Sequence, residues 1–287
     1  MSSEMSIEDK YKLIFQKENY KEEVVISYSE FLKRELNAKT RLLFRMGPYS
    51  LDDLPEPFHN VLRNAQQFHP CTQVYLHDKT DGKDFLEKYY PDMVESYHAI
   101  IPGAFKSDII RICLLEKYGG WYADMSILFN ESLSMVPENV DMVLVNDHNF
   151  RNDNVGVGIT NGFMYSKQNN PFIQKMIQHM KKNIQERVYN ESCLNITGPV
   201  ALCNCFKEFF SCPMIDKGTQ GIQIFKKDGI SYPIFWMDFR LATPFSSIEY
   251  QQKLVLQCKF EGYANLMYEA FNAKPYWKLW DERNIYA

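Results

Sequence analysis

The apolar positions along the chain follow two different spacings, which predict alternating strands and helices. Short apolar runs of strand length occupy residues 41–46, 73–77 and 142–146. Apolar residues recur at the helical period over residues 54–67 and again over 84–97. Because strands that alternate with helices usually pair in the same direction, this order predicts an α/β fold with a mainly parallel sheet.

Two further helices are predicted in the second half of the chain. Asn170 and Pro171 form a typical helix start, a cap followed by a first-turn proline, for an amphipathic helix that reaches Ile184. Residues 197–199 open an apolar helix that extends to Phe210. The pattern over residues 1–39 is helical and charged. We therefore expect a helical N-terminal extension over 1–39 and one domain over 40–287.

Residues 104–118 predict a buried helix that carries two charges. Asp108 and Arg111 are the only charged residues in the apolar stretch from Ser107 to Leu115, and their spacing of three places them on one face. Burying a charge costs on the order of several kcal/mol unless the charge is paired or ligated. An isolated pair of this kind is typical of a structural ion pair, so the pair alone does not indicate a site.

The residues that follow this helix change that interpretation. Gly119 and Gly120 tolerate positive φ, so the chain can leave the helix and enter a strand over 121–129 without a spacer. Side chains alternate across a strand, which predicts one apolar, core-facing set: Trp121, Ala123, Met125, Ile127 and Phe129. The opposite row holds Tyr122, Asp124, Ser126 and Leu128, and so places an aromatic ring, a carboxylate and a hydroxyl together. Open α/β sheets bind ligands at strand ends of this kind, and the guanidinium and carboxylates suit a diphosphate and sugar hydroxyls.

Composition and charge narrow the class of protein. With 45% hydrophobic and 15% aromatic residues, the 287-residue chain can bury a large core. Its net charge of -4 gives no basic signature, so nucleic acid is not an expected partner. No apolar run reaches the roughly 18 residues of a membrane span, and the first residues lack the apolar core of a signal peptide. We therefore expect a soluble, cytoplasmic protein without a membrane span.

Four more segments carry a family resemblance in the expected order. They are Arg41-Leu-Leu-Phe-Arg-Met46, Asn161-Gly-Phe-Met-Tyr165, Thr197-Gly-Pro199 and Tyr276-Trp-Lys-Leu-Trp280. Together with residues 107–126 they resemble glycosyltransferases with the DXD sugar-binding region. Family 32 mannosyltransferases typify this group, and the glucosyltransferase domains of large clostridial toxins are more distantly similar. The resemblance covers roughly residues 40 to 287, and its order argues against a chance match.

The resemblance implies a GT-A fold, in which a Rossmann-like, mainly parallel sheet is flanked by helices. It also implies transfer of a sugar from a UDP- or GDP-sugar to a hydroxyl acceptor, such as a glycan, with retention of configuration. In that chemistry the protein acts largely through electrostatics on the leaving diphosphate. No dedicated base is required, because the leaving phosphate oxygen can accept the proton of the acceptor.

The resemblance also assigns roles to residues. The expected catalytic residues are Asp108, Arg111 and Asp124: Arg111 contacts diphosphate and sugar, Asp108 the sugar hydroxyls, and Asp124 the ribose and any metal. Tyr122 is expected to pack on the ribose or sugar. The whole expected donor-binding set is Phe44, Arg45, Ser107, Asp108, Arg111, Gly120, Tyr122, Asp124, Ser126, Lys278 and Trp280. The expected acceptor-side set is Asn161, Gly162, Thr197 and Gly198.

One position departs from the family pattern. Residues 124–126 are Asp-Met-Ser where the family has Asp-X-Asp, whose second Asp is a direct metal ligand. A serine hydroxyl is a neutral and weaker ligand. Lys278, which with Trp280 is expected to close over the diphosphate, could replace the charge of the metal. We nevertheless expect a retained Mn2+ or Mg2+, because one Asp is present and a diphosphate itself supplies oxygen ligands. The expected metal ligands are Asp124, Ser126 and Asp281.

Two alternatives from other classes stay open. A non-catalytic nucleotide-sugar-binding protein, a degenerate transferase in which Ser126 marks the loss of metal chemistry, would bind the donor without transferring its sugar. An α/β structural protein, in which Asp108 and Arg111 only pair with each other, would bind no nucleotide. The base, the sugar and the acceptor depend on the shape of the pocket and do not follow from these motifs.

Overall fold

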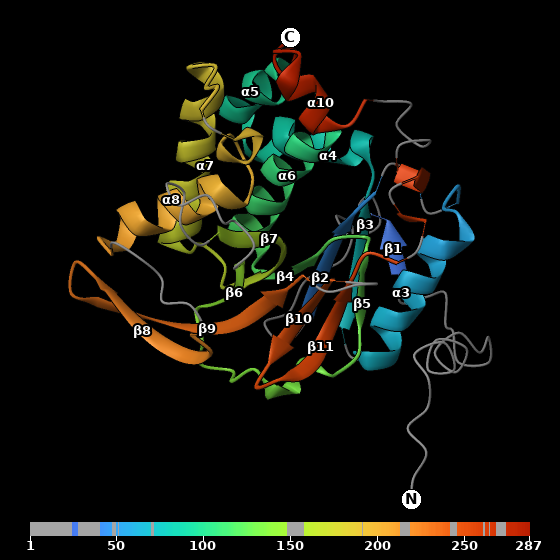
Figure 1. Ribbon diagram of the computed structural model, residues 1–287, viewed down its shortest axis with the longest axis vertical. Helices are drawn as coiled ribbons and strands as arrows, with labels where there is room; N and C mark the ends of the chain where they lie inside the picture. The colour runs from blue at the N-terminus through green and yellow to red at the C-terminus, as the bar shows by residue number, and fades with distance from the viewer. Residues whose placement is uncertain are drawn as a thin grey trace, which may run out of the picture.

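The chain folds around one mixed β-sheet (Figure 1). The computed structural model describes residues 25–27, 41–47, 50, 52–69, 72–147, 158–190, 192–212, 219–241, 246–260, 262–263, 265–267 and 274–287. The strands are β1 (Val25–Ser27), β2 (Arg41–Met46), β3 (Thr72–His77), β4 (Gly120–Ala123), β5 (Ile127–Phe129), β6 (Met142–Asp147), β7 (Gly158–Ser166), β8 (Gly221–Lys227), β9 (Ile230–Arg240), β10 (Ser246–Tyr250) and β11 (Lys253–Cys258). The helices are α3 (Glu56–Phe68), α4 (Lys79–Tyr89), α5 (Val94–Ala99), α6 (Gly103–Tyr118), α7 (Pro171–Gln185), α8 (Pro199–Phe210) and α10 (Tyr276–Asp281), with short 3-10 helices η3 (Pro91–Met93), η4 (Leu133–Met135) and η5 (Cys193–Asn195).

The predicted alternation of strands and helices is confirmed. The strand predicted over 41–46 is β2, and the buried helix predicted over 104–118 is α6. Asn170 caps α7 as predicted, because its side chain accepts a hydrogen bond from the backbone N–H of Phe172. The helical pattern over 84–97 is divided into α4, η3 and α5, because Pro91 cannot continue α4.

The sheet is parallel in its first part and mixed as a whole. Its strand order is β1-β3-β2-β4-β7-β6-β9-β10-β11-β5, with β8 paired to β9. β1, β3, β2 and β4 pair in parallel, as predicted, and so do β6 and β9. The remaining pairs are antiparallel, which the prediction of a mainly parallel sheet did not include. In one of them Gln251 and Gln252 form a two-residue turn with positive φ that joins β10 to β11.

Helices cover both faces of the sheet (Figure 1). One hydrophobic cluster packs the helices from α4 through α8 against one face of the sheet and includes Phe44 and Tyr122. A second cluster packs α3 against the other face and includes Leu43 and Ala123. The predicted core row on residues 121–129 belongs to the second cluster, so the predicted alternation is confirmed. Among the described residues, no helix combines the length and apolar character needed to cross a bilayer.

The predicted helical extension over 1–39 lies outside the described residues, apart from Val25–Ser27. These three residues form the strand β1 rather than a helix, and β1 pairs in parallel with β3. A backbone partner at the edge of the sheet therefore determines their conformation, and the helical pattern of the sequence does not.

The end of α6 leads into a strand that is shorter than predicted. Gly119 and Gly120 have φ of 67° and 96°, as the two glycines predict, and a Cβ on Gly119 would lie 2.7 Å from the backbone nitrogen of Gln168. The strand predicted over 121–129 is divided into β4 and β5 by a turn at residues 124–126. β4 pairs with β2 and β7, whereas β5 pairs with β11. This turn therefore connects two distant parts of the sheet.

Candidate active site

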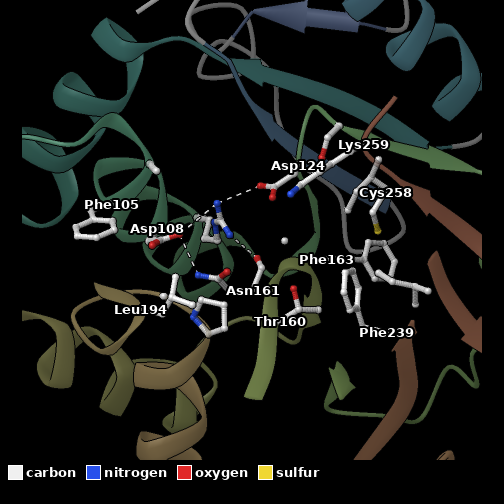
Figure 2. A pocket seen from close by; sticks show the side chains of 18 of the residues that line it. Phe105, Asp108, Asp124, Thr160, Asn161, Phe163, Leu194, Phe239, Cys258 and Lys259 are labelled. Carbon is white, nitrogen blue, oxygen red and sulfur yellow. Dashed lines mark hydrogen bonds and ion pairs between the residues drawn. The ribbon is translucent and has the colours of Figure 1, made fainter. Parts of the chain in front are cut away.

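A cavity of about 270 Å³ lies where α6, β7 and the β4–β5 turn meet (Figure 2). The strand order reverses here, because β3 lies on one side of β2 and β4 on the other, and open α/β sheets bind ligands at a switch point of this kind. Figure 2 shows Asp108, Asp124 and Asn161 converging on one region from three elements. Apolar side chains form much of the remaining wall: Phe105, Leu194, Phe239, Ile248, Cys258 and Tyr276.

Arg111 is the centre of the polar network. Its guanidinium lies 3.3 Å from the Asp108 carboxylate and 3.1 Å from the Asp124 carboxylate. Nη1 of Arg111 also donates a hydrogen bond to the backbone carbonyl of Asn161 at 2.6 Å. The guanidinium carbon lies 4.4 Å from the centroid of the Tyr122 ring, a cation–π distance. The three residues predicted to be catalytic are therefore brought together, and Arg111 holds both carboxylates.

Asp108 is buried and fully engaged by protein groups. Asn161 Nδ2 donates to Oδ1 at 2.9 Å, and the Thr197 hydroxyl donates to Oδ2 at 2.8 Å. Burial raises the pKa of Asp108 to about 6, while Arg111 and these hydrogen bonds oppose the shift. The structural alternative, in which Asp108 and Arg111 only pair with each other, does not describe this network. Thr197 is buried and does not line the cavity, but its hydroxyl bonds to Asp108, which does.

Asp124 presents one oxygen to the protein and the other to the cavity. Its Oδ1 accepts hydrogen bonds from Arg111 at 3.1 Å and from the Tyr122 hydroxyl at 2.9 Å. The side chain is 35% exposed, compared with 11% for Asp108. Because Oδ1 is fixed by two donors, the carboxylate has a defined orientation, and Oδ2 can accept hydrogen bonds from a ligand. The fixed orientation of the Asp124 carboxylate is the feature of the site most relevant to ligand binding and catalysis.

Gly162 leaves the space that this orientation needs. A Cβ built on Gly162 would lie only 2.8 Å from Oδ2 of Asp124, a separation that real Cβ atoms do not show. The backbone also ties the two residues together, since the Asp124 N–H donates to the Gly162 carbonyl at 2.8 Å. A larger residue at position 162 would therefore force Oδ2 of Asp124 to move.

We expect Gly162→Ala to displace the Asp124 carboxylate and to weaken binding of a nucleotide-sugar by about tenfold or more, the effect of losing one hydrogen bond to a charged group. Calorimetric titration measures the affinity, and circular dichroism tests whether the fold is intact. Gly82→Ala is the matched control, because Gly82 is also buried but its Cβ would meet only side chains outside the cavity, at 3.2 Å or more. Equal affinities of Gly162→Ala and the control would contradict this role.

Arg45 explains why the strand is broken at the turn. Its buried Nη1 donates to the carbonyl of Asp124 at 2.8 Å and to that of Ile127 at 3.2 Å. Burial lowers the pKa of Arg45 to about 10, against the nearby Tyr122 and Asp124, which raise it. The two carbonyls therefore bond to a side chain instead of a neighbouring strand. Arg45 and Phe44, both expected to bind the donor, lie in the core and do not line the cavity.

Three more expected donor residues lie behind the cavity wall. Tyr122 is buried, and it orients Asp124 through its hydroxyl while its ring supports Arg111, so it offers no open face for a ribose. Ser107 and Gly120 are not among the residues that line the cavity. Of the expected acceptor-side residues, Asn161, Gly162 and Gly198 line the cavity, and their role toward an acceptor stays a prediction.

The end of the chain reaches the cavity through a residue that was not assigned to the site. Tyr276, the first residue of α10, lines the cavity. Lys278 is exposed, with Nζ 5.3 Å from the Trp277 ring centroid, and Trp280 packs on Tyr189 with ring centroids 5.0 Å apart. Lys278 and Trp280 therefore do not line the cavity, and their closure over a diphosphate stays a prediction. Lys278, two positions after Tyr276, points to the opposite side of α10, whereas Trp280, four positions after it, lies near the same face but packs on Tyr189.

Among the described residues, only two of the three predicted metal ligands lie at the cavity. Asp124 and Ser126 line the cavity, but Asp281 is exposed on α10 and does not. Within the described part of the chain, no three His, Cys, Asp or Glu residues are grouped as metal ligands. A hard cation requires about six oxygen ligands, and one carboxylate with one neutral hydroxyl supplies few of them.

Lys259 is the residue of greatest interest that the motifs did not indicate. It lines the cavity beside Asp124 and Ser126, directly after β11. The only sequence signal is a lysine at the end of an apolar strand, which is equally typical of an exposed loop. Its position depends on the pairing of β11 with β5, two segments that are far apart in the chain.

Comparisons with known proteins agree with the predicted resemblance. A family model described as "Capsular polysaccharide synthesis protein" matches residues 6–252. Inositol phosphoceramide mannosyltransferase 3 of Schizosaccharomyces pombe is 22% identical over 134 residues, which are 47% of this chain and 35% of that protein. Inositol phosphoceramide mannosyltransferase 2 of the same yeast is 23% identical over 160 residues, 55% of this chain and 44% of that protein.

A third relative and one solved structure complete the comparison. Mannosyl phosphorylinositol ceramide synthase CSH1 of Saccharomyces cerevisiae is 23% identical over 164 residues, 56% of this chain and 41% of that protein. The chain thus spans less than half the length of these curated relatives. The PaToxG glycosyltransferase has a TM-score of 0.41 and 14% sequence identity, and the match covers 59% of this chain and 69% of that chain.

Proposed function

The chain belongs to the capsular polysaccharide synthesis protein family, and from this membership and the geometry of the cavity we propose that it is a glycosyltransferase. The proposed reaction moves a sugar from a nucleotide-diphosphate sugar to a hydroxyl acceptor. The names of the curated relatives support a hexosyl group, mannosyl in particular. We propose a GDP- or UDP-linked donor, as the resemblance of the sequence motifs implies. A glycan or a glycolipid headgroup would supply the acceptor hydroxyl.

The observation that carries this proposal is the half-exposed carboxylate of Asp124. Oδ1 is fixed by Arg111 and Tyr122, so Oδ2 is aimed at the cavity before any ligand binds. A carboxylate oriented in this way accepts hydrogen bonds from ribose or sugar hydroxyls at little cost in reorganisation. Arg111 compensates the negative charge of both Asp124 and Asp108, which allows the two carboxylates to lie close together in one site.

The proposed transfer is driven by charge and position. The bond between the anomeric carbon and the diphosphate oxygen breaks, and the acceptor oxygen forms a bond to the same carbon. The acceptor proton passes to the departing phosphate oxygen, so no side chain has to act as a base. For its proton to reach the departing phosphate oxygen, the acceptor must approach on the side of the leaving group. We therefore propose that the configuration is retained. The protein lowers the barrier by holding the donor and by placing positive charge near the diphosphate.

A second candidate is a nucleotide-sugar-binding protein without transfer activity. Ser126 favours it, because this hydroxyl stands where the resembled family has a metal-binding carboxylate. Both candidates bind the donor, so binding alone does not separate them. Release of the nucleoside diphosphate from the donor separates them, since only the transferase breaks the bond to the sugar.

Thermal unfolding with a panel of UDP- and GDP-sugars, with and without Mn2+, tests the shared part of both proposals. A donor at a hundred times its dissociation constant should stabilise the fold by about 2.7 kcal/mol, because it binds only the folded state. Adenosine diphosphate-sugars at the same concentration serve as the control for a general effect of nucleotides. A melting temperature that no nucleotide-sugar changes would contradict a donor site in this cavity.

A further inference from the structure

Lys259 has an unusual backbone conformation at the edge of the cavity. Its φ is 64°, in the left-handed region that side-chain-bearing residues rarely adopt. The Lys259 N–H donates to the carbonyl of Ser126 at 2.9 Å, and the preceding residue, Cys258, pairs with Ile127 in the β11–β5 register. Lys259 is therefore fixed directly opposite Ser126. Strained residues held in this way occur often at ligand-binding sites, where a side chain must take a particular direction.

The side chain of Lys259 lies on the same part of the wall as the exposed carboxylate. Lys259, Asp124 and Ser126 all line the cavity, and Figure 2 shows Lys259 on the side of Asp124 that faces away from Asp108. Lys259 is exposed and forms no ion pair with any other described residue. Its ammonium group can therefore follow a ligand without breaking an interaction within the described protein.

The balance of charges around the cavity favours an additional positive group for a diphosphate ligand. Among the described lining residues, Asp108 and Asp124 carry negative charge, and Arg111 and Lys259 carry positive charge. Arg111 is already committed to both carboxylates and to the carbonyl of Asn161. A diphosphate that enters beside two carboxylates needs an additional positive charge, and only the ammonium group of Lys259 is uncommitted among these groups. Ser126 removes a negative charge from the same place.

We infer that Lys259 binds the diphosphate of the donor in place of a divalent cation, and this inference rests on the proposed function. Ser126 and Lys259 act together in this inference: a neutral side chain stands where a metal would need a carboxylate, and a fixed positive charge lies opposite it. The ammonium group binds phosphate oxygens and stabilises the charge that grows on the leaving group. Donor binding and transfer should then need no added metal.

The test compares binding of a nucleoside diphosphate with binding of the nucleoside alone, by calorimetric titration of the whole chain. UDP with uridine and GDP with guanosine are the two probe pairs, each with EDTA and with Mn2+. The key variant is Lys259→Gly, which removes the charge and also relieves the positive φ, so its melting temperature should equal or exceed that of the wild type. Lys259→Arg keeps the charge. Lys253→Gln is the matched control, an exposed lysine on β11 that pairs with Glu131 and does not line the cavity.

We expect the wild type to bind the nucleoside diphosphate equally well in EDTA and in Mn2+. Lys259→Gly should weaken that binding by about 10- to 100-fold, the loss of one charge-assisted contact, and should leave nucleoside binding unchanged. Lys259→Arg and Lys253→Gln should stay within about threefold of the wild type. Binding that EDTA abolishes and Mn2+ restores, or a folded Lys259→Gly with wild-type affinity, would overturn the inference while leaving the proposed function intact. If the wild type binds no nucleotide in either condition, the proposed function itself fails.

Discussion

Asp124→Asn is expected to lower the rate of sugar transfer by about 10²- to 10³-fold without unfolding the protein. This is the usual cost of removing one pre-organised electrostatic group from an active site. The amide oxygen can still accept hydrogen bonds from Arg111 and Tyr122, so the turn keeps its support. The amide nitrogen would then face the cavity at the position of Oδ2, where it donates a hydrogen bond and cannot accept one from a sugar hydroxyl.

The rate of transfer or of donor hydrolysis, measured beside thermal unfolding, checks this expectation. Asp141→Asn is the matched control, because Asp141 pairs with Lys167 on the surface at 2.7 Å and lies outside the cavity. The control should keep wild-type turnover. Wild-type turnover by a folded Asp124→Asn variant would remove Asp124 from the reaction and with it the observation on which the proposed function rests.

Arg111→Met is expected to have the largest effect on stability. Removing one partner from a buried ion pair costs about 3 to 5 kcal/mol, because the remaining charge is left uncompensated. Here Asp108 would stay buried, and Asp124 would lose one of its two donors. Arg111 is only 5% exposed, so water cannot replace the lost positive charge.

Urea unfolding measures this loss, with Arg63→Met as the control. Arg63 pairs with Glu56, and the pair is partly exposed, so the control should lose at most about 1 kcal/mol. The double substitution Arg111→Met and Asp108→Asn should recover part of the stability, since the unpaired carboxylate is gone, but not the activity. If Arg111→Met is as stable as the control, the network around Arg111 is not the centre of the site.

The sequence predicted the parts of the site that depend on local order. Asp108 and Arg111 lie three residues apart on α6, and the two glycines end that helix, so their positions follow from helix geometry and backbone conformation. The polar row with Tyr122 and Asp124 follows from the alternation of side chains in a strand. These features need no knowledge of the rest of the fold, and the structure contains them.

The parts that depend on distant contacts could not be predicted in this way. The strand over 121–129 is interrupted because Arg45, 79 residues before Asp124, binds the carbonyl of the turn. Lys259, which the motifs did not indicate, lies on the cavity wall because β11 pairs with β5. No local pattern contains either contact, because each one joins segments that only the folded sheet brings together.

Release of a nucleoside diphosphate from a nucleotide-sugar is the most direct measurement of the central claim. The purified chain is incubated with each UDP- and GDP-sugar, with EDTA or Mn2+, and the released nucleotide is separated from the donor by ion-exchange chromatography. The account predicts that at least one donor is cleaved by the wild type and that Asp124→Asn reduces this cleavage by about 10²-fold or more. If a donor binds but is cleaved neither in EDTA nor in Mn2+, the account is contradicted and the protein is a nucleotide-sugar binder.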